Sequence, residues 1–137
     1  MIIQPKITRY ELLKDKAIPA DLENNFMRFY GIINRFRDIC GIPMMPTSFY
    51  RDVEDHLRIY REKGITDISK IPMKSNHLYC LACDFGGANV DKLKTWVKNN
   101  TGICSSLGLY FEDFSYTVGW LHVQIVPPAS GKMFFVP

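Results

Sequence analysis

The stretch SNHLYCLACD, residues 75–84, has polar residues near both ends and an apolar run between them. His77 and Asp84 bound this run, with six residues between them. The run continues to residue 85, and it predicts a strand that is central in its sheet and covered on both faces. Two interpretations are open. The histidine and the aspartate hold a metal ion together, or they are two polar residues that flank a buried strand.

The segments around this strand predict three helices. Residues 21–40 place apolar side chains at helical spacing, and Asp21 and Gly41 suit the start and the end of a helix. A second helix is expected after residue 52, with Asp52 as its N-cap and Gly64 as its stop. A third is expected over 89–102 and ends at Gly102.

From residue 106 onward the pattern changes to strands separated by turns. The expected strands are 45–50, 77–85, 107–113, 120–128 and 132–137. Because helices lead and antiparallel strands follow, we expect an α+β fold: N-terminal helices packed on a small, mainly antiparallel sheet. Residues 1–137 are expected to form a single domain, in which 1–19 is an extended arm that contains a short strand or turn.

Composition and charge exclude several classes of protein. The chain has 137 residues and a net charge of +3. It has no run rich in lysine and arginine, so we expect no nucleic-acid partner. The N-terminus lacks the apolar core of a signal peptide, and no apolar stretch reaches the roughly 20 residues of a membrane helix. We therefore expect synthesis in the cytoplasm, no membrane insertion and a monomer.

The four cysteines are expected to be free thiols in such a protein. Cys80 and Cys83 form a Cys-x-x-Cys pair, but no second pair follows at the spacing of a structural zinc site. A redox pair would usually stand at a helix N-terminus rather than in an apolar strand. We interpret both as thiols of the hydrophobic core.

A catalytic zinc site uses three protein ligands and leaves a fourth position for water. His122, in GWLHVQIV, can be the third ligand beside His77 and Asp84. Alternation along that strand turns Trp120, His122 and Gln124 to one face and the apolar residues to the other. Two strands can therefore each direct a ligand at a shared surface. The alternative is that a single histidine near a strand only makes a structural hydrogen bond.

SNHLYCLACD resembles the Ser-x-His-x-x-Gly-x-Ala-x-Asp signature of the D-Ala-D-Ala carboxypeptidase and L-alanyl-D-glutamate endopeptidase family, with Cys80 in place of the glycine. These are zinc peptidases of peptidoglycan that share a fold with the amino-terminal domain of hedgehog proteins. PTSFYRD (46–52) resembles the family's Thr-Ser-Gly-Tyr-Arg-Ser segment, with Phe49 for Gly and Asp52 for Ser. GWLHVQ (119–124) resembles its Trp-x-His segment. The resemblance spans residues 43–126.

The resemblance implies a Zn²⁺ cofactor held in a cleft by His77, Asp84 and His122. It also implies that Arg51 reaches into the cleft, where its fork of donors suits a carboxylate of a stem peptide or the oxyanion of the reaction. Without the resemblance, Arg51 is a candidate for a surface salt bridge with a neighbouring acid. Substrate contacts are also expected from Ser75, His56 and Trp120. Ser75 can instead orient a ligand, and His56 can simply be exposed.

The general base is where the sequence departs from the family. An acidic residue three positions before the last histidine often serves as the base, and here that position is Gly119. If 108–113 and 119–125 pair as a hairpin, Glu112 and Asp113 lie beside Gly119 and Trp120. One of the two, more suitably Glu112 for its reach, can then act on the metal-bound water. The alternative is that both are solvated turn residues, and His56 is the next candidate for the base.

Two functions remain open. The first is a zinc peptidase that cleaves bonds involving D-amino acids in peptidoglycan, such as a phage endolysin that reaches the wall when a partner opens the membrane during lysis. The second is a non-catalytic, zinc-binding structural or recognition domain of the same fold. Arg51 favours the first function, because a structural zinc needs no clamp for a substrate carboxylate. Gly119 favours the second.

Overall fold

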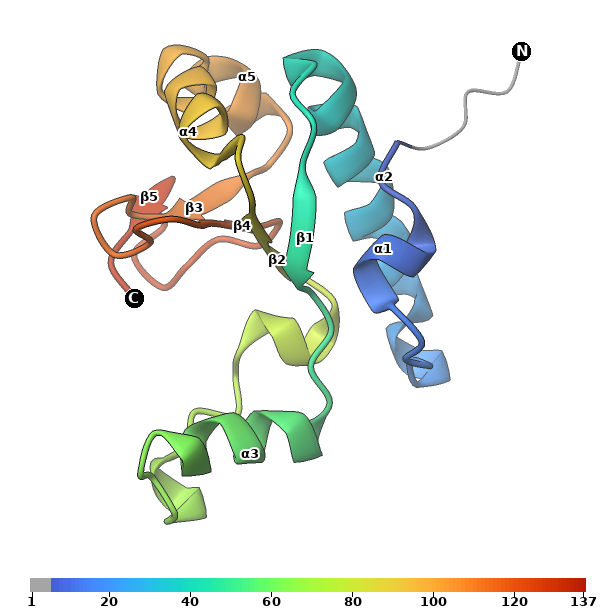
Figure 1. The fold of residues 1–137 in the computed structure, drawn as a ribbon, viewed down its shortest axis with the longest axis vertical. Helices are drawn as coiled ribbons and strands as arrows, with labels where there is room; N and C mark the ends of the chain where they lie inside the picture. The colour runs from blue at the N-terminus through green and yellow to red at the C-terminus, as the bar shows by residue number, and fades with distance from the viewer. Residues whose placement is uncertain (1–5) are drawn as a thin grey trace.

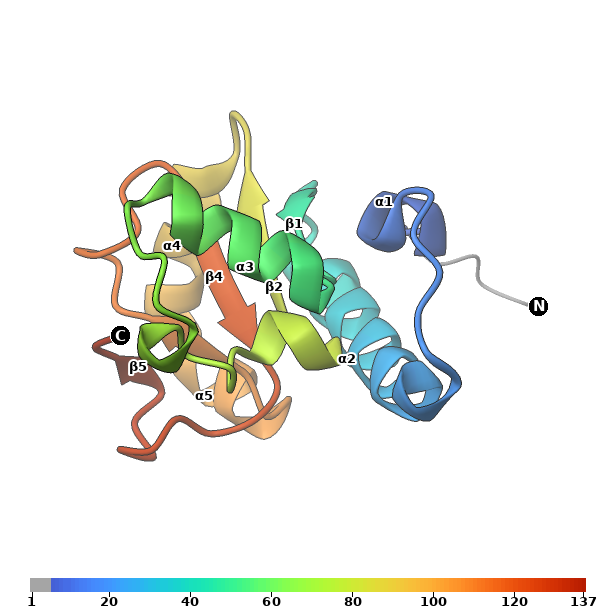
Figure 2. The same ribbon diagram turned by 90° about the horizontal axis from the view of Figure 1, so that it is seen from below.

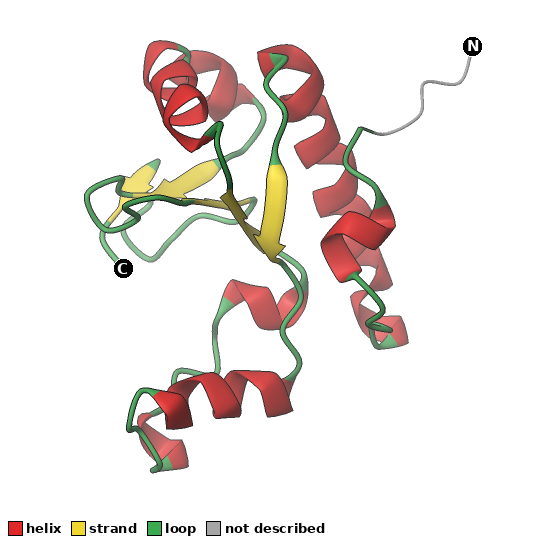
Figure 3. Cartoon of the chain, viewed as in Figure 1, coloured by secondary structure: helices red, strands yellow, loops and turns green. Residues whose placement is uncertain are grey.

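The computed structural model describes residues 6–137 and shows helices on a five-stranded mixed sheet (Figures 1 and 3). The helices are α1 (Arg9–Leu13), α2 (Glu23–Cys40), α3 (Val53–Glu62), α4 (Val90–Asn99) and α5 (Thr101–Ser106). The strands are β1 (Met45–Ser48), β2 (Ala82–Gly86), β3 (Tyr110–Glu112), β4 (Leu121–Gln124) and β5 (Phe134–Phe135). Short 3-10 turns are η1 (Ala20–Leu22), η2 (Ile68–Lys70) and η3 (Asn76–Tyr79). The predicted α+β class is confirmed.

The strand order is β1-β2-β4-β3-β5, so β2 is an inner strand, as predicted. The pairs β1–β2, β2–β4 and β3–β4 are antiparallel, whereas β3 and β5 are parallel. Three of the four pairings are antiparallel, in agreement with the predicted mainly antiparallel sheet, and β5 is the parallel exception. The β2–β4 register sets Asp84 opposite His122, which brings together two of the residues singled out in the sequence.

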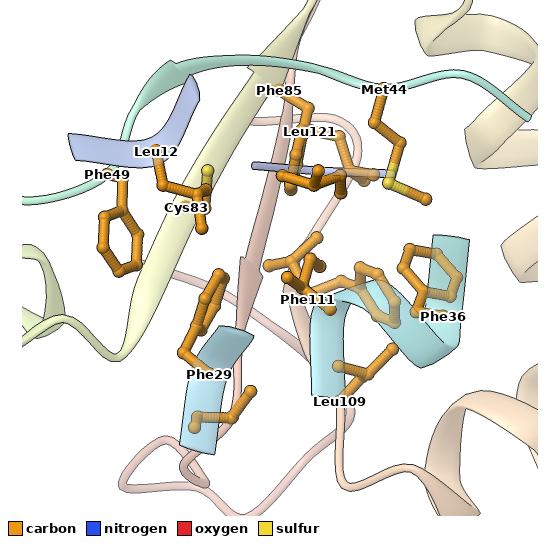
Figure 4. Close-up of a cluster of buried hydrophobic side chains, with 14 of the residues drawn as sticks. Leu12, Phe29, Phe36, Met44, Phe49, Cys83, Phe85, Leu109, Phe111 and Leu121 are labelled. Atoms are coloured by element: carbon orange, nitrogen blue, oxygen red, sulfur yellow. The ribbon is translucent and has the colours of Figure 1, made fainter. Parts of the chain in front are cut away.

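One face of the sheet packs against the hydrophobic core (Figure 4). Phe29 and Phe36 of α2, Phe85 of β2 and Phe111 of β3 are fully buried there. Large aromatic side chains each remove much apolar surface from water, so this cluster is the main stabilising feature of the fold. The alternation predicted for β4 is confirmed, because Leu121 and Val123 enter the core while His122 and Gln124 take the opposite face.

Helix α3 lies outside this core. Figure 1 shows it on the side of the sheet away from α4 and α5, and Figure 2, seen from that side, shows it in front of β2 and β4. Its N-cap is Asp52, as predicted, since that side chain accepts a hydrogen bond from the backbone N–H of Asp55. Within the described residues, His56 is the buried residue that α3 contributes.

Two predicted helix boundaries were wrong. Residues 20–22 form the η1 turn, so Asp21 does not cap α2, which begins at Glu23. The third helix ends before Gly102, which lies inside the separate short helix α5. The predicted end at Gly41 is confirmed, because its φ of 68° closes α2 in the left-handed conformation.

The predicted extended arm, 1–19, is corrected where it can be followed. Residues 1–5 lie outside the described part of the chain. Helix α1 takes the place of the expected strand or turn, because Thr8 and Glu11 form a capping box at its start. Leu12 and Leu13 of α1 are buried in the core, so this segment packs onto the domain.

The strand predicted over 77–85 is also corrected. Its first half forms the η3 turn, and β2 starts only at Ala82. Cys80 joins the two with a φ of 60°, a left-handed conformation that glycine adopts with least strain. His77 therefore comes from a turn rather than a strand, and only one face of β2 is packed in the core.

Cys80 and Cys83 are buried members of the hydrophobic cluster and free thiols, as predicted. Burial raises the pKa of Cys80 to about 12, so it stays a thiol at physiological pH. Among the helices of residues 6–137, none combines the length and the apolar composition needed to span a bilayer.

Candidate metal centre

His77, Asp84 and His122 come together on the sheet face opposite the core. Each offers one ligand atom, and these atoms lie within 4.8 Å of one another. The Asp84 carboxylate stands between the two rings, with Oδ1 2.8 Å from His122 Nδ1 and Oδ2 3.4 Å from His77 Nε2. Both histidines are buried. The three side chains form a group that can hold a metal ion.

The other nitrogen of each ring faces an oxygen acceptor. His77 Nδ1 donates to the Phe49 carbonyl at 2.8 Å, which leaves Nε2 facing Asp84. His122 Nε2 lies 2.8 Å from Gln124 Oε1, and the Gln124 amide nitrogen donates in turn to the Val126 carbonyl. These outer contacts fix both rings with one nitrogen turned to the shared centre. Metal-binding histidines are commonly oriented in this way.

The charges of the three groups depend on one another. Burial alone would raise the pKa of Asp84, but its hydrogen bonds to His122 and His77 outweigh burial and lower that pKa to about 2. Burial would lower the pKa of His122, yet the contact with Asp84 raises it overall. Without metal, both His122 nitrogens face acceptors, so the ring favours two protons. A metal ion would replace the proton on Nδ1.

These residues form the floor of a cleft of about 640 Å³. One side is the helical wall, residues 51–75. The other is the sheet wall, which is formed by β2, β3, β4, β5, Trp120 just before β4 and the C-terminal Pro137. The helical wall contributes Arg51, Tyr60, Lys63, Pro72, Lys74 and Ser75. The sheet wall contributes Glu112, Trp120, Gln124, Phe135 and Pro137. Cationic side chains thus stand on the helical wall, opposite a carboxylate on the sheet wall.

The structure brings Arg51, Ser75 and Trp120 to this cleft, where the sequence analysis expected them. The Arg51 backbone N–H donates to the His77 carbonyl, so the arginine is tied to the candidate metal centre through the main chain. Its side chain contacts His56, with Nη1 3.3 Å from His56 Nδ1. Arg51 Nε is buried and has no hydrogen-bond partner among residues 6–137.

The two candidate bases are placed differently. Glu112 lines the cleft, and burial raises the pKa of its carboxyl, although the nearby His122 opposes this shift. Asp113 does not belong to the cleft lining. Its carboxylate accepts hydrogen bonds from the Ser115 N–H and hydroxyl, which is the arrangement of a turn. The β3–β4 register, continued by one residue, sets Glu112 beside His122 rather than beside Gly119 and Trp120.

His56 is not in the cleft lining either, although the sequence analysis expected it to contact substrate or to be exposed. It is fully buried beneath the helical wall. Gly119 adopts a φ of 83°, which an acidic residue would adopt only with strain. The backbone conformation therefore gives a physical reason for glycine at the position where the resembling family often has its base.

Comparison of the chain with protein-family models, curated proteins and solved structures finds no match.

The groups that hold the candidate ligands in place were not predicted from the sequence. Two are backbone carbonyls, those of Phe49 and Val126, and a carbonyl acceptor has no signature in the sequence. Gln124 did have a signature in the sequence, because the strand alternation placed it on the same face as His122. A polar residue two positions from a candidate ligand on a buried strand is therefore a useful signal.

Proposed function

We propose that this chain is a zinc-dependent peptidase that hydrolyses peptide bonds involving D-amino acids in peptidoglycan. The observation that supports it most is the convergence of two buried histidine nitrogens on one partly buried carboxylate, at the floor of a cleft. The rest of the proposal draws on the three motifs, which resemble the peptidoglycan peptidases in the same order along the chain.

The donor set fits zinc. Two imidazoles and one carboxylate are three protein ligands of the kinds that catalytic zinc sites use, which leaves a position for water or substrate. Softer sites contain thiolates, and magnesium or calcium sites are built from oxygen. Zn²⁺ bound here would polarise the scissile carbonyl and make water a nucleophile at neutral pH.

The chain's own residues supply the other steps. Arg51 meets a substrate carboxylate or the oxyanion that forms on the scissile carbonyl, because a guanidinium presents several N–H donors in one plane. Glu112 takes the proton from the attacking water and transfers it to the leaving amine nitrogen. A carboxyl whose pKa is raised by burial holds a proton more readily in the second half of this cycle.

The substrate class follows from the resemblance and from charge. Stem peptides of peptidoglycan end in a carboxylate, and Arg51, Lys63 and Lys74 make one side of the cleft cationic. A phage endolysin that is released to the wall during lysis is the setting we propose for such an enzyme.

The test is an assay of the hydrolysis of purified peptidoglycan. The release of new amino groups is measured with and without a chelator. We expect activity that chelator removes and Zn²⁺ restores, and one equivalent of zinc by elemental analysis. His122→Ala should lose both zinc and activity, whereas the matched variant His56→Gln should keep zinc. Protein that carries no metal when purified without chelator would contradict the proposal.

Gly119 supports a second candidate, a zinc-binding domain without catalysis. Gly119 stands at the position where the family that the sequence resembles often has an acidic base, so this position offers no side chain that can move a proton. The two candidates differ in one result: a non-catalytic domain would bind zinc with the same three residues and hydrolyse no peptidoglycan.

A further inference from the structure

His56 is a fully buried histidine in a helix that lies outside the hydrophobic core. Both of its ring nitrogens have partners. Nε2 lies 2.7 Å from the Pro72 carbonyl, and Nδ1 lies 3.3 Å from Arg51 Nη1. A carbonyl can only accept and a guanidinium can only donate. The ring therefore carries its proton on Nε2 and offers the Nδ1 lone pair to Arg51.

These two hydrogen bonds join separate parts of the helical wall. Arg51 precedes α3 and Pro72 follows it, and both line the cleft. The ring of Tyr60, one turn further along α3, lies 4.9 Å from the His56 ring and also faces the cleft. His56 thus lies behind the cleft surface and contacts three of the residues that form it.

We propose that His56 is a positioning residue, which holds the Arg51 guanidinium by Nη1 so that its remaining N–H donors face the cleft. The inference rests on the proposed function, because the group that Arg51 meets is the carboxylate or oxyanion of the substrate. It goes beyond that function by assigning a role to a residue that does not touch substrate. The hydrogen bonds of Arg51 support it: among residues 6–137, Nε is buried without a partner, and the contact of Nη1 with His56 is the one that fixes the guanidinium.

The kinetic test is a double-mutant cycle on hydrolysis of a soluble stem peptide. His56→Leu should lower kcat/KM by about 10- to 100-fold, as misplacement of a binding group does. The loss should be divided between kcat and KM in the same proportion as the loss caused by Arg51→Met. In the Arg51→Met background, His56→Leu should have no further effect. Additive losses would overturn the proposal.

Two variants separate positioning from general damage to α3. His56→Gln keeps one acceptor and one donor, so it should retain kcat/KM within about threefold of wild type. Leu57→Ala changes the neighbouring residue, which is half-buried, and should leave kcat/KM unchanged. If His56→Gln loses as much as His56→Leu, or Leu57→Ala loses as much as either, the role assigned to His56 is wrong.

A spectroscopic test does not depend on activity. In ¹⁵N NMR of the His56 ring, Nε2 should be protonated and Nδ1 should be an acceptor. Arg51→Met should shift the Nδ1 resonance and leave Nε2 in place. An unchanged Nδ1 resonance would overturn the positioning role even if the enzyme is active. The expected shift in a protein without peptidase activity would overturn the proposed function and keep the Arg51–His56 contact.

Discussion

The two walls of the cleft are built in different ways. The sheet wall is backed by the aromatic cluster, in which Phe29, Phe85 and Phe111 are fully buried. Among residues 6–137, the helical wall has no comparable cluster behind it, and polar contacts hold it in place. His56 bonds to Pro72 and Arg51, Asp52 caps α3, and Lys16 pairs with Asp55 at 2.9 Å.

This difference suits the two tasks of the proposed site. Metal ligands must be held within fractions of an ångström, and two of the three project from strands whose other face lies in the close-packed core. A wall that meets a flexible peptide can tolerate local opening, and segments with few buried apolar contacts open at low cost. We therefore expect chemistry to depend on the sheet wall, and substrate admission on the helical wall.

The largest expected effect concerns the chemistry on the sheet wall. Glu112→Gln should lower kcat by about 10²- to 10⁴-fold while zinc stays bound, because it removes the group that we propose moves the proton. Asp113→Asn, one residue further on, should remain near wild type, since its carboxylate serves a turn. The measurement is steady-state hydrolysis of peptidoglycan with zinc content determined in parallel. Full activity of Glu112→Gln would place the base elsewhere.

The second prediction contrasts the stability of the two walls. Phe29→Ala should lower the free energy of unfolding by about 3–5 kcal/mol, because it leaves a cavity in the aromatic cluster. Leu57→Ala in α3 should cost less, about 1 kcal/mol, because that side chain is only half-buried and lies outside the cluster. Urea denaturation of both variants checks the comparison. Equal losses would show that the walls are equally well packed.

The third prediction concerns pH in the metal-free protein. The lowered pKa of Asp84 contributes about 2 kcal/mol of stability, present above pH ~4 and lost as pH falls toward 2. The raised pKa of His122 contributes stability that is present below pH ~6.5 and lost as pH rises through that raised pKa.

Thermal unfolding of metal-free protein should thus show greatest stability between about pH 4 and 6.5. Zinc should reverse the alkaline loss, because deprotonated ligands bind it more tightly. Asp84→Asn should flatten the acidic side of the curve of stability against pH. An unchanged acidic side in that variant would contradict the assigned pairing.

The smallest expected effect is in the loop before β4. Gly119→Ala should cost about 1 kcal/mol, because alanine is strained at a φ of 83° even though the space is open. Gly102→Ala is the matched control, since it lies in α5, has an ordinary φ and also has open space around it. It should be neutral or stabilising by about 0.5–1 kcal/mol. Equal effects in chemical denaturation would refute the explanation given for Gly119.

The sequence predicted the features that depend on local periodicity. The spacing of apolar residues in 21–40, the end at Gly41 and the alternation around His122 were enough to place α2 and one face of β4. It failed where a short apolar run can form either a strand or a turn, as at His77. It also failed where packing between distant segments decides, as for His56, whose burial depends on a carbonyl 16 residues away.

The segment 49–51 fixes His77 twice: the Phe49 carbonyl holds its side chain and the Arg51 N–H holds its backbone. Inserting or deleting one residue there would displace His77, a candidate metal ligand, and Arg51, the proposed anion-binding residue, together. For protein engineering, this makes the segment a poor place to alter substrate preference. Lys63 and Lys74 of the same cleft lie beyond the segment in the chain, and they are the positions at which charge can be varied while the ligand frame is kept.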